Sequence, residues 1–477
     1  MQNAAAVVRA VADSDAVALV ALLQACAIGV RTPAATGIAI LANAPPGEAT
    51  NPMRESLAAA GAVPPLVAML RDGTAEEQAA AAEALWKLAR NTANRKTIAA
   101  AGGIEALVKL TRKGDAAGKS KGAIALWNVA CSDAANKARI TAAGGIAPLV
   151  ALVRDGDAEG KANAAGALRI LARGDDAISA AIRAAGGIAP LVTLVRDGDA
   201  AGKANAAGAL WSLAFSDAAN KAGITAAGGI EALVALVRDG DAAGKANAAV
   251  ALQNLAAADD ANKAAIRAAG GIDALVTLVR DGDAAGKANA AGALRIMAAA
   301  DDANKAAIRA AGGIEALVVL VRNGDADGKA NAAGALWDLA AGDDGITAAI
   351  RDAGGIEALV TLVRDGDAAG RSNAAGALCI LAADDVVKIV AMLDHPDSHV
   401  RLAAVSTLGQ LDAATLDQHA PALVARLADS DENVRRVAVS TLCKLDTATL
   451  AQHAPALVAR LEDSDSDVRW KAVSTLG

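Results

Sequence analysis

The chain has 477 residues and a formal net charge of −7, and 54% of its residues are hydrophobic although only 1% are aromatic. The apolar content is therefore mainly Ala, Val, Leu and Ile, which favours close-packed helices over a β-sandwich or one large core. Acidic and basic residues are interspersed and form no basic stripe, so nucleic acid is not expected as a partner.

Cysteine spacing and apolar runs bear on the cellular compartment. The four cysteines are far apart and include no CxxC pair: Cys26, Cys131, Cys379 and Cys443. This pattern predicts reduced thiols in an intracellular protein, with the cytoplasm as the expected compartment. The most apolar run, AVALVALLQACAIGV from Ala16, is too short to cross a bilayer and contains Gln24. Neither a membrane span nor an N-terminal signal is expected.

Residues 1–60 contain the segment AVALVALLQA followed by GIAILANA, with an insertion at Pro45-Pro46-Gly47. Both segments are degenerate versions of sequences that recur later in the chain. Repeat arrays commonly end in an atypical copy that covers the apolar face of its neighbour. We therefore expect residues 1–60 to form an N-terminal repeat or cap.

A repeat occupies residues 61–384. The pair Gly-Gly-Ile recurs every 42 residues, and Gly61 begins one further copy 41 residues before the first pair. The pairs begin at Gly102, Gly144, Gly186, Gly228, Gly270, Gly312 and Gly354. The copy from Gly270 to Ala311 reads GGIDALVTLVRDGDAAGKANAAGALRIMAAADDANKAAIRAA. A period of this length is typical of stacked helical repeats.

Each copy is predicted to form three helices. A short first helix, ANKAAIRAA, follows Asp301 and ends at Gly312, where glycine can adopt the left-handed conformation. The second, IEALVVLVR, ends at Arg322 just before Gly324, and Asp325 is placed to cap the third, ADGKANAAGALWDLAA. The second helix directs four apolar side chains to one side: Ile314, Leu317, Val318 and Leu320.

This arrangement resembles the armadillo repeat, and the resemblance covers roughly Gly61 to Asp384 through the segments AGGIxALVxLV and ALxxLA. It implies an all-α, right-handed superhelical α-solenoid whose third helices line a concave groove. One repeat cannot bury its apolar faces alone, whereas stacked neighbours can, so stability grows with each repeat and interface.

Residues 385–477 follow a different period. Val400, Val434 and Val468 are 34 residues apart, each within the pattern D-x-x-V-R. This segment resembles the two-helix HEAT repeat, which implies that the Asp caps the second helix and the Arg hydrogen-bonds into the neighbouring unit. The chain stops at KAVSTLG, so we expect the last helix to be truncated relative to its equivalents.

One segment, GDAAGKSKGA at residues 114–123, resembles a phosphate-binding loop. Three residues separate Gly114 from Gly118, whereas the phosphate loop needs four. Close copies recur along the array, and in most of them Ala follows the Lys and cannot hold a magnesium ion. A turn between two helices is therefore predicted, with no nucleotide.

Histidines and carboxylates suggest no catalytic site. His395 and His399 are four residues apart, near Asp394 and Asp397, but the pair straddles a turn and lacks a firm third metal ligand. The other two histidines, His419 and His453, occupy the same repeat position. We expect no enzyme activity, cofactor or metal.

An informative variable position lies after Ala-Leu in the third helix. It is occupied by Trp86, Trp127, Arg169, Trp211, Gln253, Arg295, Trp337 and Cys379, and we call it the slot. At about 100° per residue, the slot of one copy is predicted to share an outward face with a glycine, an asparagine and a serine: Trp211, Gly208, Asn205 and Ser212. The asparagine recurs as Asn163, Asn205, Asn247, Asn289, Asn331 and Asn373, here called the Asn row. The alternative is that each tryptophan packs against the next repeat.

The armadillo resemblance implies a groove in which an Asn ladder holds an extended peptide between tryptophans. The ladder position is occupied by Lys87, Asn128, Ile170, Ser212, Asn254, Ile296, Asp338 and Ile380. The family's Trp position is occupied by Glu83, Ile124, Gly166, Gly208, Val250, Gly292, Gly334 and Gly376. Only two ladder asparagines and none of the tryptophans remain, so recognition of basic localisation signals is not carried over.

These observations predict a non-enzymatic interaction scaffold that binds an extended segment of a partner protein along the groove. The slot should supply most of the affinity, with the Asn row and Asn128 and Asn254 beside it, and Arg169 and Arg295 favour acidic or aromatic side chains in the partner. The alternative is a structural spacer in a cytoskeletal or ciliary assembly, with the groove unused. The oligomeric state stays open.

Overall fold

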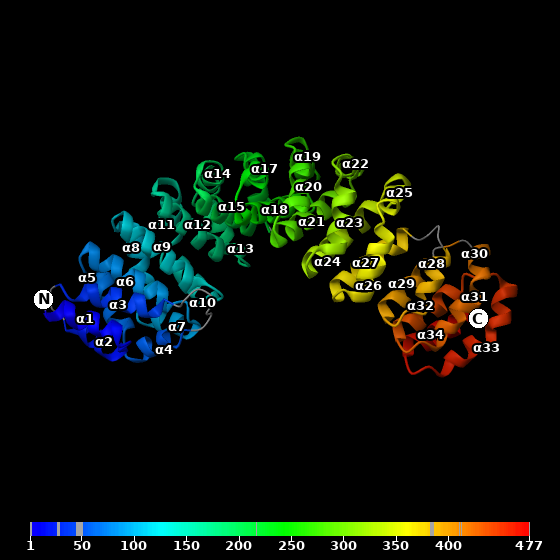
Figure 1. Ribbon diagram of the computed structural model, residues 1–477, viewed down its shortest axis with the longest axis horizontal. Helices are drawn as coiled ribbons and strands as arrows, with labels where there is room; N and C mark the ends of the chain where they lie inside the picture. The colour runs from blue at the N-terminus through cyan, green and yellow to red at the C-terminus, as the bar shows by residue number, and fades with distance from the viewer. Residues whose placement is uncertain are drawn as a thin grey trace. The chain divides into compact units, whose positions relative to one another are not determined.

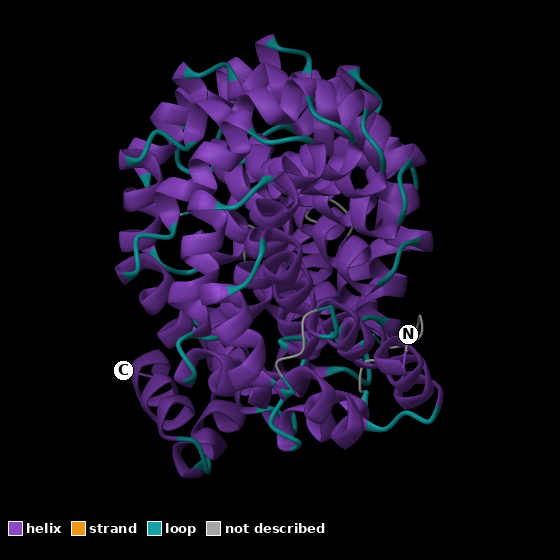
Figure 2. Ribbon diagram, turned by 90° about the vertical axis from the view of Figure 1, so that its left-hand side faces the viewer, coloured by secondary structure: helices purple, strands orange, loops and turns teal. Residues whose placement is uncertain are grey.

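The computed structural model describes residues 2–25, 29–43, 51–215, 217–381, 386–409, 411 and 413–476. They form two compact units, Met1–Leu255 and Ala256–Gly477. The described residues form helices and contain no strand, which confirms the all-α solenoid (Figures 1 and 2). The predictions for Cys26, for the insertion at Pro45-Pro46-Gly47 and for the side chain of Cys379 lie outside the described residues.

Three helices precede the regular repeats: α1 (Gln2–Ala12), α2 (Ala16–Gln24) and α3 (Arg31–Ala42). The predicted segment AVALVALLQA coincides with α2, whose first turn is capped by the Asp15 side chain, an acceptor for the Ala18 N–H. Leu19 and Leu23 of α2 are buried, as is Ile38 of α3, so these helices share an apolar core.

Sets of three helices then recur along the chain. The first helices are α4 (Pro52–Ala59), α7 (Thr92–Ala100), α10 (Ala134–Ala142), α13 (Asp176–Ala184), α16 (Ala218–Ala226), α19 (Asp260–Ala268), α22 (Asp302–Ala310) and α25 (Asp344–Asp352). The second helices are α5 (Val63–Asp72), α8 (Gly103–Lys113), α11 (Ile146–Asp155), α14 (Ile188–Asp197), α17 (Gly229–Asp239), α20 (Gly271–Asp281), α23 (Gly313–Asn323) and α26 (Gly355–Asp365). The third helices are α6 (Ala75–Leu88), α9 (Ala116–Ala130), α12 (Ala158–Ala172), α15 (Ala200–Ala214), α18 (Ala242–Ala256), α21 (Ala284–Ala298), α24 (Ala326–Ala340) and α27 (Ala368–Leu381).

Capping residues set these boundaries as predicted. Asp301 caps α22 by accepting from the Asn304 N–H, and Asp325 caps α24 by accepting from the Gly328 N–H at 2.8 Å. Gly312 separates α22 from α23 with a φ of 74°. Only glycine adopts this conformation without steric cost, so the recurring Gly-Gly pair ends the first helix and starts the second.

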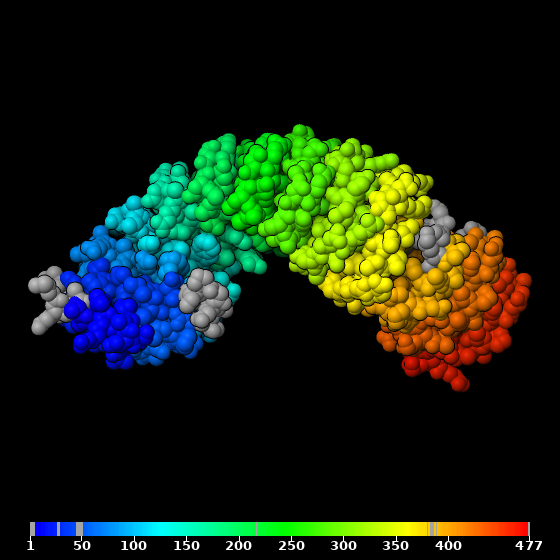
Figure 3. Space-filling model, in the orientation of Figure 1, coloured from blue at the N-terminus to red at the C-terminus, as the bar shows by residue number. Residues whose placement is uncertain are grey.

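The core of each repeat lies between the second and third helices. Leu317 of α23 and Leu336 of α24 are both fully buried. Third helices also pack on one another, since α12 contacts both α9 and α15. The α12 surface in these contacts is built from alanines and glycine, whose small side chains allow a close approach. Figure 3 shows successive repeats of each unit in continuous contact.

Buried asparagines in the first helices join one repeat to the next. The Asn220 side chain is fully buried and donates to the Leu213 carbonyl at 3.0 Å. Its Oδ1 accepts from Arg183 of the preceding repeat at 2.7 Å. Asn136 and Asn304 make the equivalent bonds to the third helix before them. The sequence analysis did not single out this asparagine, although it recurs in the segment ANKA as Asn136, Asn220, Asn262 and Asn304.

The C-terminal part consists of α28 (Val386–Met392), α29 (Ser398–Leu408), α30 (Ala413–Gln418), α31 (Ala420–Ala425), η1 (Arg426–Ala428), α32 (Glu432–Leu442), α33 (Thr447–Val458), η2 (Ala459–Glu462) and α34 (Ser466–Leu476). The expectation of a truncated last helix is wrong. Helix α34 has 11 residues, as do its equivalents α29 and α32. The equivalent helices end at the STL segment because the chain turns there, and α34 reaches the same point.

Buried ion pairs connect the C-terminal repeats. Arg401 contacts Asp429 of the next repeat at 2.6 Å, and Arg435 contacts Asp463 at 2.8 Å. The two carboxylates are 2% and 3% exposed. Asp397 caps α29 as the HEAT resemblance implied, and both arginines reach the neighbouring unit. The sequence analysis did not identify the two acceptor carboxylates.

Replacing Asp429 with Ala should lower the free energy of unfolding of this region by about 3–5 kcal/mol, because the Arg401 guanidinium would stay buried without its partner. Urea unfolding followed by hydrogen exchange of peptides covering α29 and α32 measures the change. The control is Asp467→Ala, since Asp467 is 66% exposed and faces Arg436 at 3.5 Å; an exposed pair contributes about 0–1 kcal/mol. Equal effects of the two substitutions would contradict this assignment.

The same pairs predict acid sensitivity. Burial acts to raise the pKa of Asp429 and Asp463, but hydrogen bonds from Arg401 and Arg435 hold the pKa of each carboxyl below its ordinary value. Their stabilising contribution is therefore complete above the unfolded pKa of about 3.9 and is lost as the pH falls through the lower folded values. We expect hydrogen-exchange protection of α29 and α32 to decrease as the pH is lowered from 5 to values below the unfolded pKa of the carboxyls. The double variant Asp429→Asn/Asp463→Asn should show less of this dependence.

Candidate functional site

The segment that resembles a phosphate loop is a capped turn. The Asp115 side chain accepts from the Gly118 N–H at 2.7 Å, and α9 begins directly after it. The buried Ser120 hydroxyl accepts from the Asn163 amide of the next repeat at 3.0 Å. The Gly118 N–H and the Ser120 hydroxyl are thus engaged within the fold, in keeping with the predicted structural turn.

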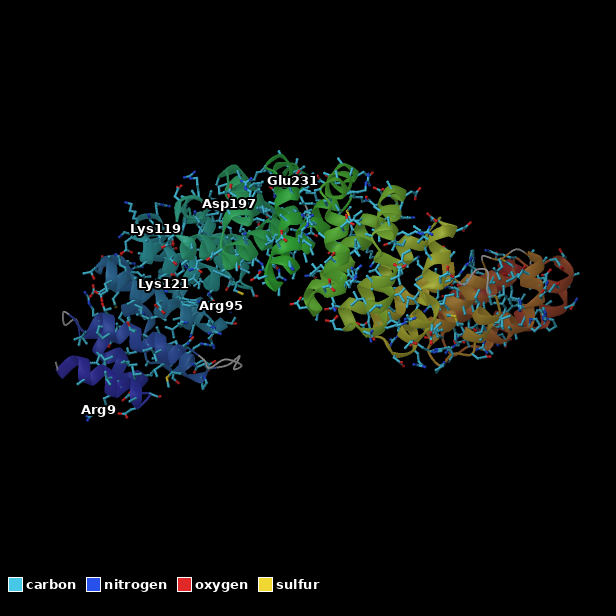
Figure 4. All side chains as sticks on the ribbon, turned by 45° about the horizontal axis from the view of Figure 1, so that its top comes forward. Arg9, Arg95, Lys119, Lys121, Asp197 and Glu231 are labelled. Carbon is cyan, nitrogen blue, oxygen red and sulfur yellow. The ribbon has the colours of Figure 1, made fainter. Side chains whose placement is uncertain are left out.

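A surface hollow recurs between successive second helices. One copy has a volume of about 500 Å³ and is lined by Lys119 and Leu152, and the next has about 320 Å³ and is lined by Lys161, Leu194 and Asp197. Figure 4 labels Lys119 and Asp197. Equivalent residues line a third copy in the second unit. Since the hollow repeats with the fold, it arises from helix stacking.

The histidine pair is used locally. The His395 ring Nδ1 accepts from the Asp397 N–H at 3.1 Å, and the His399 ring lies 3.2 Å from the Asp397 carboxylate. Within the described residues, no group of three or more His, Cys, Asp or Glu side chains is arranged to hold a metal ion.

Slot side chains pack on the third helix of the following repeat. A Cβ on Gly166 would overlap the Trp127 ring, and one on Gly208 would lie 2.8 Å from Arg169 Cδ. Arg295 and Trp337 cover two further glycines, Gly334 and Gly376, in the same way. The alternative that slot residues pack against the next repeat therefore holds for these four positions. The side chains remain partly accessible, and Trp337 is 36% exposed.

The predicted outward face is only partly correct. Trp211 and Asn205 are half-buried, but Gly208 and Ser212 are buried. The reason at Gly208 is the neighbouring third helix, because the Cδ and guanidinium atoms of Arg169 lie against that glycine. The prediction was made by projecting a single helix, and such a projection does not include the third helix of the preceding repeat.

The Asn row holds the third helices together. The Asn205 amide donates to the Ala162 carbonyl of the preceding third helix at 3.0 Å. Asn247, Asn331 and Asn373 donate to the carbonyls of Ala204, Ala288 and Ala330 at 2.9, 3.0 and 2.8 Å. Asn163 is buried and bonds Ser120, and Asn289 occupies the equivalent position. The row therefore uses N–H donors to fix the alignment of adjacent repeats.

The two remaining ladder asparagines also bond to helix backbone. Asn128 donates to the Ile124 carbonyl of its own helix at 3.0 Å. Asn254 donates to the Trp211 carbonyl of the preceding third helix at 3.3 Å. Both are half-buried, so each keeps part of its amide accessible beside the slot.

Cations surround two of the slot tryptophans. Lys87 Nζ lies 3.8 Å from the centre of the Trp86 ring, and Lys121 lies 5.9 Å from it. Lys121, labelled in Figure 4, also lies 3.8 Å from Glu83 and 3.4 Å from Glu159, which links α9 to its two neighbouring third helices. Exposed ion pairs of this kind contribute little stability, so their main effect is on the charge of the surface.

The second cation cluster surrounds Trp211. The guanidinium carbons of Arg169 and Arg173 lie 5.4 Å and 6.0 Å from the ring centre. Burial, and secondarily the charge of Arg173, lowers the pKa of Arg169. The third-helix surface is thus a row of half-buried aromatic and cationic groups, a combination that anchors protein interfaces when a partner covers it.

Among the described helices, none is by itself long and apolar enough to cross a membrane. One pair, α13 and α14, reaches the required length and composition only together, and it is bent by 81°.

The fold and the slot geometry define an α-helical repeat protein of the solenoid class. The family model for the Armadillo/beta-catenin-like repeat matches residues 133–173, 175–215, 218–257, 259–299, 301–341 and 343–383, and that for HEAT repeats matches residues 420–477. The chain belongs to the armadillo repeat family and carries HEAT repeats at its C-terminal end. Repeats of these families generally bind protein partners and are typically non-enzymatic scaffolds.

Solved structures of engineered proteins are similar to this chain. One crystal structure is 32% identical, covers 92% of this chain and 99% of its own, and superposes with a TM-score of 0.72. A second is 35% identical and covers 50% of this chain and 96% of its own, with a TM-score of 0.48. No curated protein is significantly similar in sequence to this chain.

The packing of Trp127 on Gly166 predicts a coupled pair of substitutions. Gly166→Ala should destabilise the protein by about 1–3 kcal/mol, because the added methyl group overpacks against the ring. In a Trp127→Ala background the same substitution should be neutral or stabilise by up to about 1 kcal/mol, since Ala favours helix interiors. Urea unfolding of the wild type, both single variants and the double variant measures the coupling. An identical effect of Gly166→Ala in both backgrounds would show that the ring does not cover the glycine.

Proposed function

We propose that this protein is a non-enzymatic interaction scaffold that binds an extended segment of a partner protein along the groove lined by its third helices. The observation that carries the proposal is the slot. Near-identical repeats vary there between aromatic, cationic and amide side chains, and each described slot side chain remains partly accessible. Variation at an accessible position is expected where successive repeats bind different side chains of a partner.

The arrangement of the third helices supports an extended ligand. In the first unit, α6, α9, α12 and α15 pack in succession, so their slots form a row. An extended chain can contact such a row with successive side chains. A buried Trp or Arg anchor contributes about 2 kcal/mol or more to binding, compared with about 1 kcal/mol for a neutral hydrogen bond. The slot should therefore supply most of the affinity.

The second candidate is a structural spacer, and the Asn row favours it. These amides donate to neighbouring helices, and slot rings pack on the next repeat. These hydrogen bonds and apolar contacts all stabilise the stacking of repeats, and a spacer requires a stable stack. In that case partners would contact repeat edges and helix ends while the slot stays empty.

Site-specific photo-crosslinking separates the two candidates. A benzophenone side chain replaces Gln253 in the slot of α18, and in a second variant it replaces Thr193, which is exposed on the second helix α14. The scaffold predicts crosslinks to one partner segment from position 253 and none to that segment from position 193. The crosslink should weaken at least about tenfold with Trp211→Ala, the loss expected for an anchor residue.

Circular dichroism and urea unfolding of each variant verify that the array stays folded. Crosslinks from position 193 alone, or a crosslink from position 253 that Trp211→Ala leaves unchanged, would favour the spacer.

A further inference from the structure

Arg169 is a half-buried cation that pairs with no carboxylate among the residues that the structure describes. Its Cδ, Nε and Cζ atoms lie against Gly208 of the next repeat, and its guanidinium carbon lies 5.4 Å from the centre of the Trp211 ring. Over the part of the chain that the structure describes, its five N–H donors make no hydrogen bond and no carboxylate pairs with it. Another cation, Arg173, lies over the same ring, and its charge contributes to lowering the pKa of Arg169. Among the described residues, the site therefore combines two arginines with no carboxylate in an ion pair to either.

The slot three repeats later holds Arg295, and its hydrogen bond shows which group pairs with an arginine in this position. Arg295 packs over Gly334 as Arg169 packs over Gly208. Unlike Arg169, it donates to the Asp338 carboxylate of the next third helix at 3.2 Å. In the earlier repeat the position equivalent to Asp338 is Ser212, which is buried and donates its hydroxyl proton to the Gly208 carbonyl at 3.1 Å. The repeat in which Arg169 has no hydrogen-bonded carboxylate is thus the one in which Ser212 replaces the aspartate.

We infer that Arg169, together with Arg173 over the face of Trp211, binds an Asp or Glu side chain of the extended partner segment, as Asp338 binds Arg295. This inference rests on the proposed function and names one side chain that the groove selects. A guanidinium matches a carboxylate with two parallel N–H···O bonds. A carboxylate would also offset the repulsion between the two arginines.

The surroundings favour an anion over the aromatic alternative. Two guanidinium groups already face the Trp211 ring, so an aromatic partner side chain would have to displace them. A basic side chain would be repelled by both. The lowered pKa of Arg169, due first to burial and then to Arg173, also indicates a positive charge that its environment does not compensate.

The test uses the full chain and two synthetic peptides, one alternating Glu and Ala and the other alternating Gln and Ala. Nuclear magnetic resonance follows the indole N–H signals, and a Trp211→Phe variant assigns that of Trp211. We expect the Glu peptide to shift the Trp211 signal and the Gln peptide to leave it unchanged. Affinity for the Glu peptide should fall about tenfold or more in Arg169→Gln, because a hydrogen bond to a charged group is lost.

Two further variants distinguish the site from general charge attraction. Ser212→Asp supplies an internal carboxylate, by analogy with Asp338, and should abolish the Trp211 shift while the protein stays folded. Arg295→Gln, which removes an arginine that already has its carboxylate, should leave the shift unchanged. If Ser212→Asp unfolds the array, Arg173→Gln replaces it and should weaken binding.

The inference is overturned if the Glu peptide does not shift the Trp211 signal, or if the shift persists in both Arg169→Gln and Ser212→Asp. A shift produced equally by the Gln peptide would overturn it too. These outcomes leave the proposed function standing when crosslinking from position 253 still identifies a partner segment. Loss of that crosslinking, with the Glu peptide still bound at Arg169, would instead reject the extended-segment scaffold.

Discussion

The close packing of third helix on third helix is the contact on which the armadillo part of the structure depends. Alanines such as Ala164, Ala165 and Ala167 are fully buried between neighbouring helices, and their small side chains permit a short separation between the helix axes. This separation brings an asparagine amide within hydrogen-bonding distance of the preceding helix. It also leaves no room for a side chain at Gly166 and Gly208, because the slot residue of the preceding repeat lies there.

Slot residues consequently have two roles at once. One face of Trp127 or Arg169 fills the space above a glycine of the next repeat, while the remainder of the side chain stays accessible. Packing and recognition are therefore not exclusive interpretations of the same tryptophan. The accessible remainder is rigid, because the glycine contact holds the ring in place, and rigid aromatic groups lose little conformational entropy when a partner covers them.

The C-terminal repeats join their neighbours by different chemistry. There, Arg401 and Arg435 each bind a carboxylate of the next repeat in a buried pair. Such pairs stabilise little relative to apolar packing but strongly penalise the loss of one partner. They specify which repeat edge fits the next, as the Asn row does in the armadillo part. Arginine also occupies the slot in two repeats. Arg295 bonds a carboxylate of the next repeat, whereas Arg169 bonds none among the described residues, and this difference distinguishes the two repeats.

The sequence by itself determined the helices, their order and their boundaries. Asp301, Gly312 and Asp325 act through hydrogen bonds and backbone conformations within a few residues of themselves, and the repeat period identifies the solenoid because only stacking can bury its apolar faces. The length of the last helix was misjudged from the same local signals. What the tertiary structure alone decided is which groups are accessible. Gly208 and Ser212 project outward from a single helix and are nevertheless buried, and Arg169 differs from Arg295 through a residue on another repeat. Both facts depend on contacts between residues about 40 positions apart, and no pattern within one helix contains them.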